Sequence, residues 1–142
     1  MSEAIRPEQP PYPGEAWTEI VRRPTLEEFS RAFASDVVLE ASVVSSPIVG
    51  PAGLWKFFQA TREMYERIGF THEIGNKART CLEWAGVFAG KPVAGATIIT
   101  RDDRGAITRV RLYHRPFDQV VAFAEMISRR LCLGVTGNPR AR

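Results

Sequence analysis

The chain has 142 residues, of which 44% are hydrophobic and 25% charged, so we expect one globular domain with a single core. No apolar run approaches the roughly 18 residues of a membrane-spanning helix, which excludes a membrane as a partner. The formal net charge is +3, but the arginines between residues 101 and 130 alternate with acids such as Asp102 and Asp103, a mixture typical of a solvated surface and not of a nucleic-acid interface.

The first residues are rich in proline and carry little to bury. We predict an extended arm at residues 1–16, a folded domain at residues 17–133 and a flexible basic tail at residues 134–142. The arm lacks the pattern of a secretory signal, and neither Cys81 nor Cys132 has metal or disulfide spacing. We therefore expect a cytoplasmic protein with two reduced thiols.

Two short helices are predicted before the first strand. Trp17 to Val21 can form one helical turn before Pro24 interrupts it. Thr25 and Glu28 have the spacing of a capping box, so a second short helix is expected to run from there through Phe33.

A strand and the longest helix of the first half follow. Residues 36–44 are mostly β-branched and apolar, which predicts a strand, and residues 45–50 read as a loop. Pro51 is typical of a first helical position, and we expect a helix from there to Gly69. Its core-facing residues recur at three- and four-residue spacing: Leu54, Phe57, Phe58, Thr61, Met64, Tyr65 and Ile68.

The rest of the chain predicts an antiparallel meander and a closing helix. Apolar side chains alternate with period two in residues 70–74, 77–88, 92–101 and 106–115, and Gly90 and Gly105 lie in the hairpin connections. One side of the last helix is apolar, with Phe117, Val120, Val121, Ala124, Ile127 and Leu131. This order predicts an α+β fold, in which a curved antiparallel sheet wraps around the N-terminal helices.

The strand at residues 106–115 places a histidine in the interior. Val110, Leu112 and His114 share one face, and Arg109 and Arg111 share the other. Burial would keep the His114 ring neutral at pH 7 and able to accept a proton. The alternative is a histidine of the core whose ring is bonded to a backbone carbonyl.

Three other polar residues have an ambiguous orientation. Glu40 points to solvent if Leu39, Ala41 and Val43 point inward, and a one-residue bulge would reverse this. Glu83, next to Trp84, has the same ambiguity, and the register of His72 is uncertain. The sequence contains no Ser-His-Asp arrangement, phosphate-binding glycine loop or metal spacing, so we expect neither a cofactor nor a metal.

The chain resembles the nuclear transport factor 2-like superfamily, a cone-shaped α+β fold that includes ketosteroid isomerases and SnoaL-like polyketide cyclases. The resemblance covers about Trp17 to Leu131. It rests on the segment Phe33–Glu40, on Gly50 ahead of a Phe-rich helix, on Gly90-Lys91-Pro92 leading to Asp103–Ile107, and on the ending His114-Arg115-Pro116-Phe117. This ending is similar to that of a bacterial subgroup whose members mostly lack an assigned activity.

The resemblance also implies where catalytic residues would stand. The base of ketosteroid isomerases falls on Ala41, and their buried acid falls on Thr97 or, with another gap, on Ile99. Neither charge is present, so isomerisation by that route is not expected. The strand around Cys81–Trp84 offers no Arg-x-Asp of the related epoxide hydrolases, whereas scytalone dehydratases use histidines with an acid, which keeps His114 as a candidate.

Two hypotheses of function follow, and they are compatible. The first is a domain that binds a small hydrophobic molecule in an apolar pocket, with His114 as a possible base of an isomerase, cyclase or lyase and with Thr97 or Tyr65 donating to the developing oxyanion. The second is a non-catalytic domain that forms a homodimer or docks a partner through the outer sheet face. The expected pocket is lined by Leu39, Ala41, Phe58, Leu82, Trp84, Ile99, Val110, Leu112 and His114.

Overall fold

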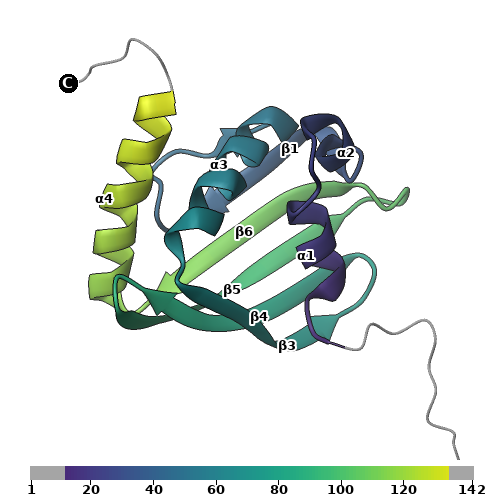
Figure 1. The fold of residues 1–142 in the computed structure, drawn as a ribbon. Helices are drawn as coiled ribbons and strands as arrows, with labels where there is room; N and C mark the ends of the chain where they lie inside the picture. Colours follow the sequence, from purple (N-terminus) through teal and green to yellow (C-terminus); the bar gives the residue numbers. More distant parts are fainter. Residues whose placement is uncertain (1–11, 135–142) are drawn as a thin grey trace, which may run out of the picture.

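The structure, a computed structural model, describes residues 12–134 (Figure 1). Most of the expected arm and tail, residues 1–11 and 135–142, lies outside the described residues. Within residues 12–134 the elements follow in the order α1 (Glu15–Val21), α2 (Leu26–Ser30), β1 (Phe33–Ala41), β2 (Ile48–Val49), α3 (Pro51–Met64), β3 (Arg67–Gly75), β4 (Arg79–Phe88), β5 (Lys91–Arg101), β6 (Ile107–Arg115) and α4 (Phe117–Gly134).

The strands form one curved, unclosed sheet, which confirms the predicted α+β class. Their order is β2-β1-β6-β5-β4-β3, and every neighbouring pair is antiparallel except β1 and β6, which run parallel. Figure 1 shows α1, α2 and α3 along one face of this sheet and α4 at one end of it. The face that carries α1 to α3 is called the concave face below, and the opposite one the outer face.

The alternation of side chains places the core on the concave face. Val110, Leu112 and His114 of β6 are buried, as predicted, and so are Leu82 and Trp84 of β4. The helices add large aromatic rings to this layer, and Phe29, Phe57 and Phe123 are among the fully buried side chains. Each such ring stabilises the fold by roughly 2–3 kcal/mol relative to exposure.

The helix after Pro51 is five residues shorter than predicted. It ends at Met64, because Tyr65 is extended and the Glu66 N–H donates to the Val87 carbonyl at 2.8 Å. The chain therefore leaves the helix to pair with the edge of β4. Ile68, expected on the core side of the helix, instead lies in β3 with 46% of its surface exposed.

Two smaller differences concern the segment before α3. Phe33 was expected to end a helix, but α2 stops at Ser30 and Phe33 is the first residue of β1. The predicted loop at residues 45–50 contains the two-residue strand β2, whose Val49 pairs with Val38. The cap of α2 is as predicted on one side: Thr25 Oγ1 accepts a hydrogen bond from the Glu28 N–H at 3.1 Å.

The closing helix α4 is amphipathic, as predicted, and packs against α3 and β6. Ile127 is fully buried as predicted, and so is Phe123, which was not predicted on this side; Phe117 and Val121, predicted on the apolar side, are instead exposed. Among the described residues, no helix is both long enough and apolar enough to cross a membrane.

Candidate functional site

A buried tyrosine-histidine pair lies at the end of the concave face that α4 covers. His114 is the last inward-facing residue of β6 and is 7% exposed. Tyr65 is the residue at which α3 ends, and its Oη lies 2.6 Å from His114 Nε2. The structure thus brings together two of the three residues that the sequence predicted to be catalytic.

Aromatic side chains enclose the pair. The ring of His114 lies 4.9 Å from that of Trp84 and 4.6 Å from that of Phe123, measured between centroids. Burial among these rings lowers the pKa of His114 to about 4, and it raises the pKa of the Tyr65 phenol above its usual range. Both side chains are therefore neutral at pH 7, and the hydrogen bond between them joins two uncharged groups.

One atom of this pair has no partner within residues 12–134. His114 Nδ1 is buried and meets no hydrogen-bonding atom, while the backbone N–H of His114 donates to Ser42 Oγ at 3.0 Å. If Tyr65 donates to Nε2, Nδ1 carries the proton and is a donor; in the other tautomer it is an acceptor. In either case Nδ1 is the ring nitrogen that is left without a partner among the described residues.

Thr97, the third predicted residue, is buried but lies apart from the pair. In the sheet Thr97 pairs with Leu82 of β4 and Leu112 of β6. His114 pairs instead with Gly95, two residues before Thr97 in β5. Thr97 Oγ1 accepts a hydrogen bond from Trp84 Nε1 at 3.2 Å, and the ring of Trp84 contacts His114. Thr97 is thus linked to His114 through the Trp84 indole.

The residues predicted to line an apolar pocket lie in the packed core. Those besides His114 are all buried: Leu39, Ala41, Phe58, Leu82, Trp84, Ile99, Val110 and Leu112. Of these, Leu82 and Ile99 also line an open cavity. His114 is not among the residues that line this cavity, and Trp84, two residues beyond Leu82 on the same face of β4, contacts His114.

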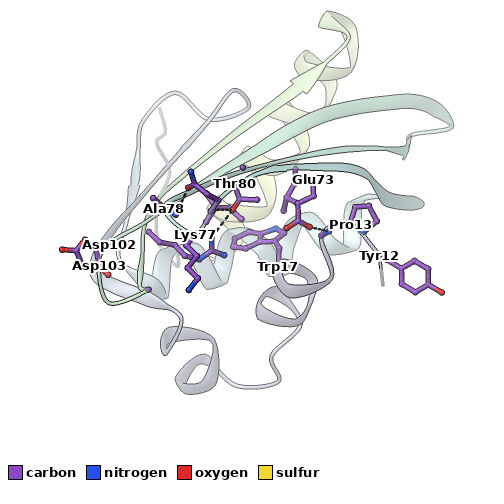
Figure 2. A pocket seen from close by; sticks show the side chains of 16 residues that line it. Tyr12, Pro13, Trp17, Glu73, Lys77, Ala78, Thr80, Asp102 and Asp103 are labelled. Atoms are coloured by element: carbon purple, nitrogen blue, oxygen red, sulfur yellow. Dashed lines mark hydrogen bonds between the residues drawn. The ribbon is translucent and has the colours of Figure 1, made fainter. Parts of the chain in front are cut away.

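The open cavity lies at the other end of the concave face, between α1 and the hairpin connections, and has a volume of about 950 Å³. Its lining comes from the segment before α1 and from α1 itself (Tyr12, Pro13, Gly14, Trp17), from the β3–β4 hairpin (Glu73, Gly75, Asn76, Lys77, Ala78, Thr80) and from β5 and its turn (Arg101, Asp102, Asp103, Gly105), together with Leu82 and Ile99 (Figure 2).

Sequence reasoning missed this cavity, although one signal for it was present. Arg101 has the same parity as Thr97 and Ile99 in β5, so alternation alone places it on the concave face. The position of Trp17 gave no comparable signal, because it depends on contacts between distant segments. The Gly14 N–H donates to Glu73 Oε1 at 2.9 Å, and a side chain on Gly14 would collide with the Phe70 ring.

The outer face carries the two acids of ambiguous orientation. Glu40 points outward, as expected from its buried neighbours, and its Oε1 accepts hydrogen bonds from Arg111 Nε and Arg109 Nη1, both at 3.0 Å. The bond from Arg111 is the largest influence that holds the pKa of Glu40 below its usual value. A register shift between Phe70 and His72 turns His72 outward, where its Nδ1 lies 3.2 Å from Glu83 Oε1.

The outer face also has a shallow groove of about 430 Å³ next to these acids. Small residues of β4 and β5 form its floor, namely Ala85, Ala94, Gly95 and Ala96. Tyr113 and Arg115 of β6 flank it. No cluster of three or more His, Cys, Asp or Glu side chains suited to a metal ion occurs in the described part of the chain.

Comparisons with solved structures identify the fold. A steroid delta-isomerase from Pseudomonas aeruginosa superposes with a TM-score of 0.75 at 19% identity, over 86% of this chain and 90% of that one. An uncharacterized bacterial protein with a cystatin-like fold, from Silicibacter pomeroyi, gives a TM-score of 0.75 at 16% identity, over 82% and 83% of the two chains. A protein of ketosteroid isomerase-like fold from Catenulispora acidiphila, in complex with trimethylamine, gives 0.56 at 18% identity, over 78% and 90%.

The chain therefore has the fold of ketosteroid isomerase-like and nuclear transport factor 2-like proteins, as the sequence resemblance implied. No protein-family model matches the sequence, and no curated protein matches it. At identities this low, the likeness establishes the fold, and function has to be argued from the site.

Proposed function

We propose that this protein is a small-molecule-binding domain whose ligand enters the concave face of the sheet. The observation that carries the proposal is the cavity of about 950 Å³ between α1 and the sheet, which falls in the size range of small-molecule sites. The buried apolar residues Leu82 and Ile99 belong to its lining, which suits the hydrophobic ligand expected from the sequence. A solved neighbour of this fold contains a bound small molecule, which supports the same class of function.

The catalytic form of the proposal gives His114 the role of a base toward a carbon acid, and it requires a ligand that extends from the open cavity to His114, which is not among the lining residues of that cavity. His114 is neutral above pH 4, and because Tyr65 occupies Nε2, the accepting atom would be Nδ1. The low pKa makes His114 a weak base, so the substrate has to be activated by an adjacent carbonyl. Thr97 and Tyr65 are the hydroxyl donors that could stabilise the oxyanion formed on that carbonyl.

Ketosteroid isomerisation in the manner of the Pseudomonas aeruginosa neighbour is not part of this proposal. The positions that resemble the base and the buried acid of such enzymes are Ala41 and Thr97, and both side chains are uncharged. A reaction that starts with carbon deprotonation would rely on His114 instead.

The binding function is tested by native mass spectrometry of the purified protein, followed by extraction of any molecule that co-purifies. The catalytic form is tested by incubating that molecule with the protein in D₂O and measuring deuterium incorporation at carbon. We expect incorporation with the wild type and none with His114→Ala, whose melting curve shows whether the fold is retained. Exchange that persists in a folded His114→Ala protein would exclude His114 as the base.

A second candidate function is a homodimer formed through the outer sheet face. The observation that favours it is a group of exposed apolar side chains on this face, with Ile74 64% and Tyr113 48% exposed. Tyr113 lines the outer groove, whereas Ile74 lies in the edge strand β3, outside the lining of that groove. Dimerisation and ligand binding use opposite faces of the sheet, so one does not exclude the other.

A further inference from the structure

Arg101 has an unusual position at the open end of the concave face. It is the last residue of β5, half-buried, and its backbone N–H donates to the Ala78 carbonyl at 2.9 Å. Its Nη1 donates to Thr80 Oγ1 at 3.3 Å, and the Thr80 hydroxyl in turn donates to the Asn76 carbonyl at 3.1 Å. This chain of bonds orients the guanidinium within the cavity wall.

Most of the hydrogen-bonding capacity of Arg101 is unused within the part of the chain that the structure describes. A guanidinium has five N–H donors, and within residues 12–134 its side chain makes the single bond to Thr80. None of the ion pairs in the described part of the chain involves Arg101. A partly desolvated guanidinium is normally matched by an anion, because removing its charge from water is costly.

Two of the three acids that line the cavity are engaged by backbone N–H groups, and the third, Asp103, makes no hydrogen bond or ion pair within residues 12–134. Glu73 Oε1 accepts from the Gly14 N–H, and Asp102 Oδ1 accepts from the N–H groups of Arg104 and Ala106 within the β5–β6 turn. In Figure 2, Asp102 and Asp103 lie at one edge of the cavity and Tyr12 at the other. Lys77, in the β3–β4 hairpin, adds a second positive charge to the lining.

The cavity also has an apolar part next to Arg101. Leu82 follows the polar rim along β4, Ile99 precedes it along β5, and Trp17 of α1 lines the cavity as well. Ile99 is two residues from Arg101 on the same strand face, a separation of about 7 Å. A ligand that contacts both Arg101 and the apolar part of the cavity needs an anionic group at one end and an apolar body.

We propose that the ligand of this cavity is an amphipathic carboxylic acid, whose carboxylate pairs with Arg101 and whose apolar chain lies against Leu82, Ile99 and Trp17. The planar guanidinium suits a carboxylate because it can donate two parallel N–H···O bonds. This inference rests on the small-molecule-binding function proposed above and narrows its ligand from a hydrophobic molecule to an acid.

The test compares two probes that differ only in the polar end, decanoate and 1-decanol. Each displaces the neutral fluorescent reporter N-phenyl-1-naphthylamine, at pH 7 and below the concentration at which decanoate forms micelles. We expect the wild type to bind decanoate at least about tenfold more tightly than decanol, since a charge-assisted bidentate pair contributes a factor of this order. Arg101→Gln should remove this preference and leave decanol binding unchanged.

Two further variants make the comparison specific. Arg104→Gln removes an exposed arginine of the same turn that does not line the cavity, and it should keep the preference for decanoate. Thr80→Val keeps the side-chain volume but removes the hydroxyl that orients Arg101, and it should lower decanoate affinity severalfold without affecting decanol. Thr80→Val also provides a test if Arg101→Gln does not fold.

The outcomes separate this inference from the proposed function. Equal affinities of the wild type for decanoate and decanol, or a preference that survives Arg101→Gln, would overturn the assignment of an acid while binding itself stands. Absence of saturable binding of the reporter and of both probes would instead contradict small-molecule binding in this cavity.

Discussion

At the scale of single residues, the chemistry of this protein centres on His114. Its ring is held by Tyr65 and packed between Trp84 and Phe123. Each of these contacts disfavours the imidazolium, because none supplies a negative charge and all exclude water. A neutral imidazole in such a site can act as a donor or as an acceptor, and protonating it lowers the stability of the fold.

This burial predicts that His114 makes stability depend on pH. The pKa is lowered to about 4 in the folded state, from 6.5 when the ring is free. Between these values the unfolded chain binds a proton that the folded chain does not, so stability is full above pH 6.5 and is lost as the pH falls toward 4. We expect the wild type to lose about 2 kcal/mol of unfolding free energy from pH 7 to pH 5 through this residue.

Urea denaturation at the two pH values measures the effect. His114→Gln is the comparison, because glutamine keeps a neutral polar side chain at this position and cannot titrate. The variant should be less stable at pH 7 but should lose less on acidification than the wild type. Equal losses in the two proteins would contradict a buried, neutral His114.

At the scale of elements, the central strands owe their close packing to a glycine. Gly95 of β5 pairs with Trp84 on one side and with His114 on the other. A side chain here would collide with the Tyr113 carbonyl of β6 and with the Trp84 ring. The absence of a side chain at Gly95 thus lets the indole lie over β5, where it reaches Thr97 and contacts His114.

We predict that Gly95→Ala destabilises the fold by roughly 1–3 kcal/mol, the usual cost of overpacking a core. It should also change the near-ultraviolet circular dichroism of the tryptophans, because the Trp84 ring has to move. Gly69→Ala is the matched control: it also lies in a strand, and an added Cβ there meets no atom within 4 Å. Unfolding free energies that are the same for both variants would argue against this account of Gly95.

At the scale of the whole molecule, the two faces of the sheet serve different purposes. The concave face carries the core, the cavity and the Tyr65–His114 pair. The outer face carries the bridge from Glu40 to Arg109 and Arg111, and two exposed apolar side chains, Tyr113 in β6 and Ile74 in β3. Exposed apolar groups rimmed by charges are typical of protein–protein interfaces.

From this arrangement we predict a dimer, seen by size-exclusion chromatography with light scattering as a species of twice the chain mass. Tyr113→Asp should give a monomer and leave binding of the naphthylamine reporter unchanged. Tyr113→Asp tests the interface more specifically than charge reversal at Arg111, because the latter would also break the ion pair with Glu40 within one chain. Val121→Asp, at an exposed apolar site on α4, should remain dimeric. A wild-type monomer at high concentration would exclude this interface.

Local sequence patterns predicted some features of this fold correctly and others wrongly. Period-two alternation in β6 placed His114 inward and Arg111 outward correctly, because successive side chains of a strand point to opposite faces. The end of α3 was missed by five residues, since the helical spacing of apolar residues continues to Ile68. The hydrogen bond from Glu66 to Val87, which joins distant segments, ends the helix earlier.

The sequence by itself determined the α+β class, the order of the main helices and strands, and the face of each residue in a regular strand such as β6, because propensity and periodicity act over a few neighbouring residues. The tertiary structure alone decided that Tyr65 meets His114, 49 residues away, and that Arg101 and Trp17 share a cavity. These contacts depend on how the sheet curves and on where α1 and α3 pack against it. Those placements result from packing of the whole domain, which local sequence patterns do not encode.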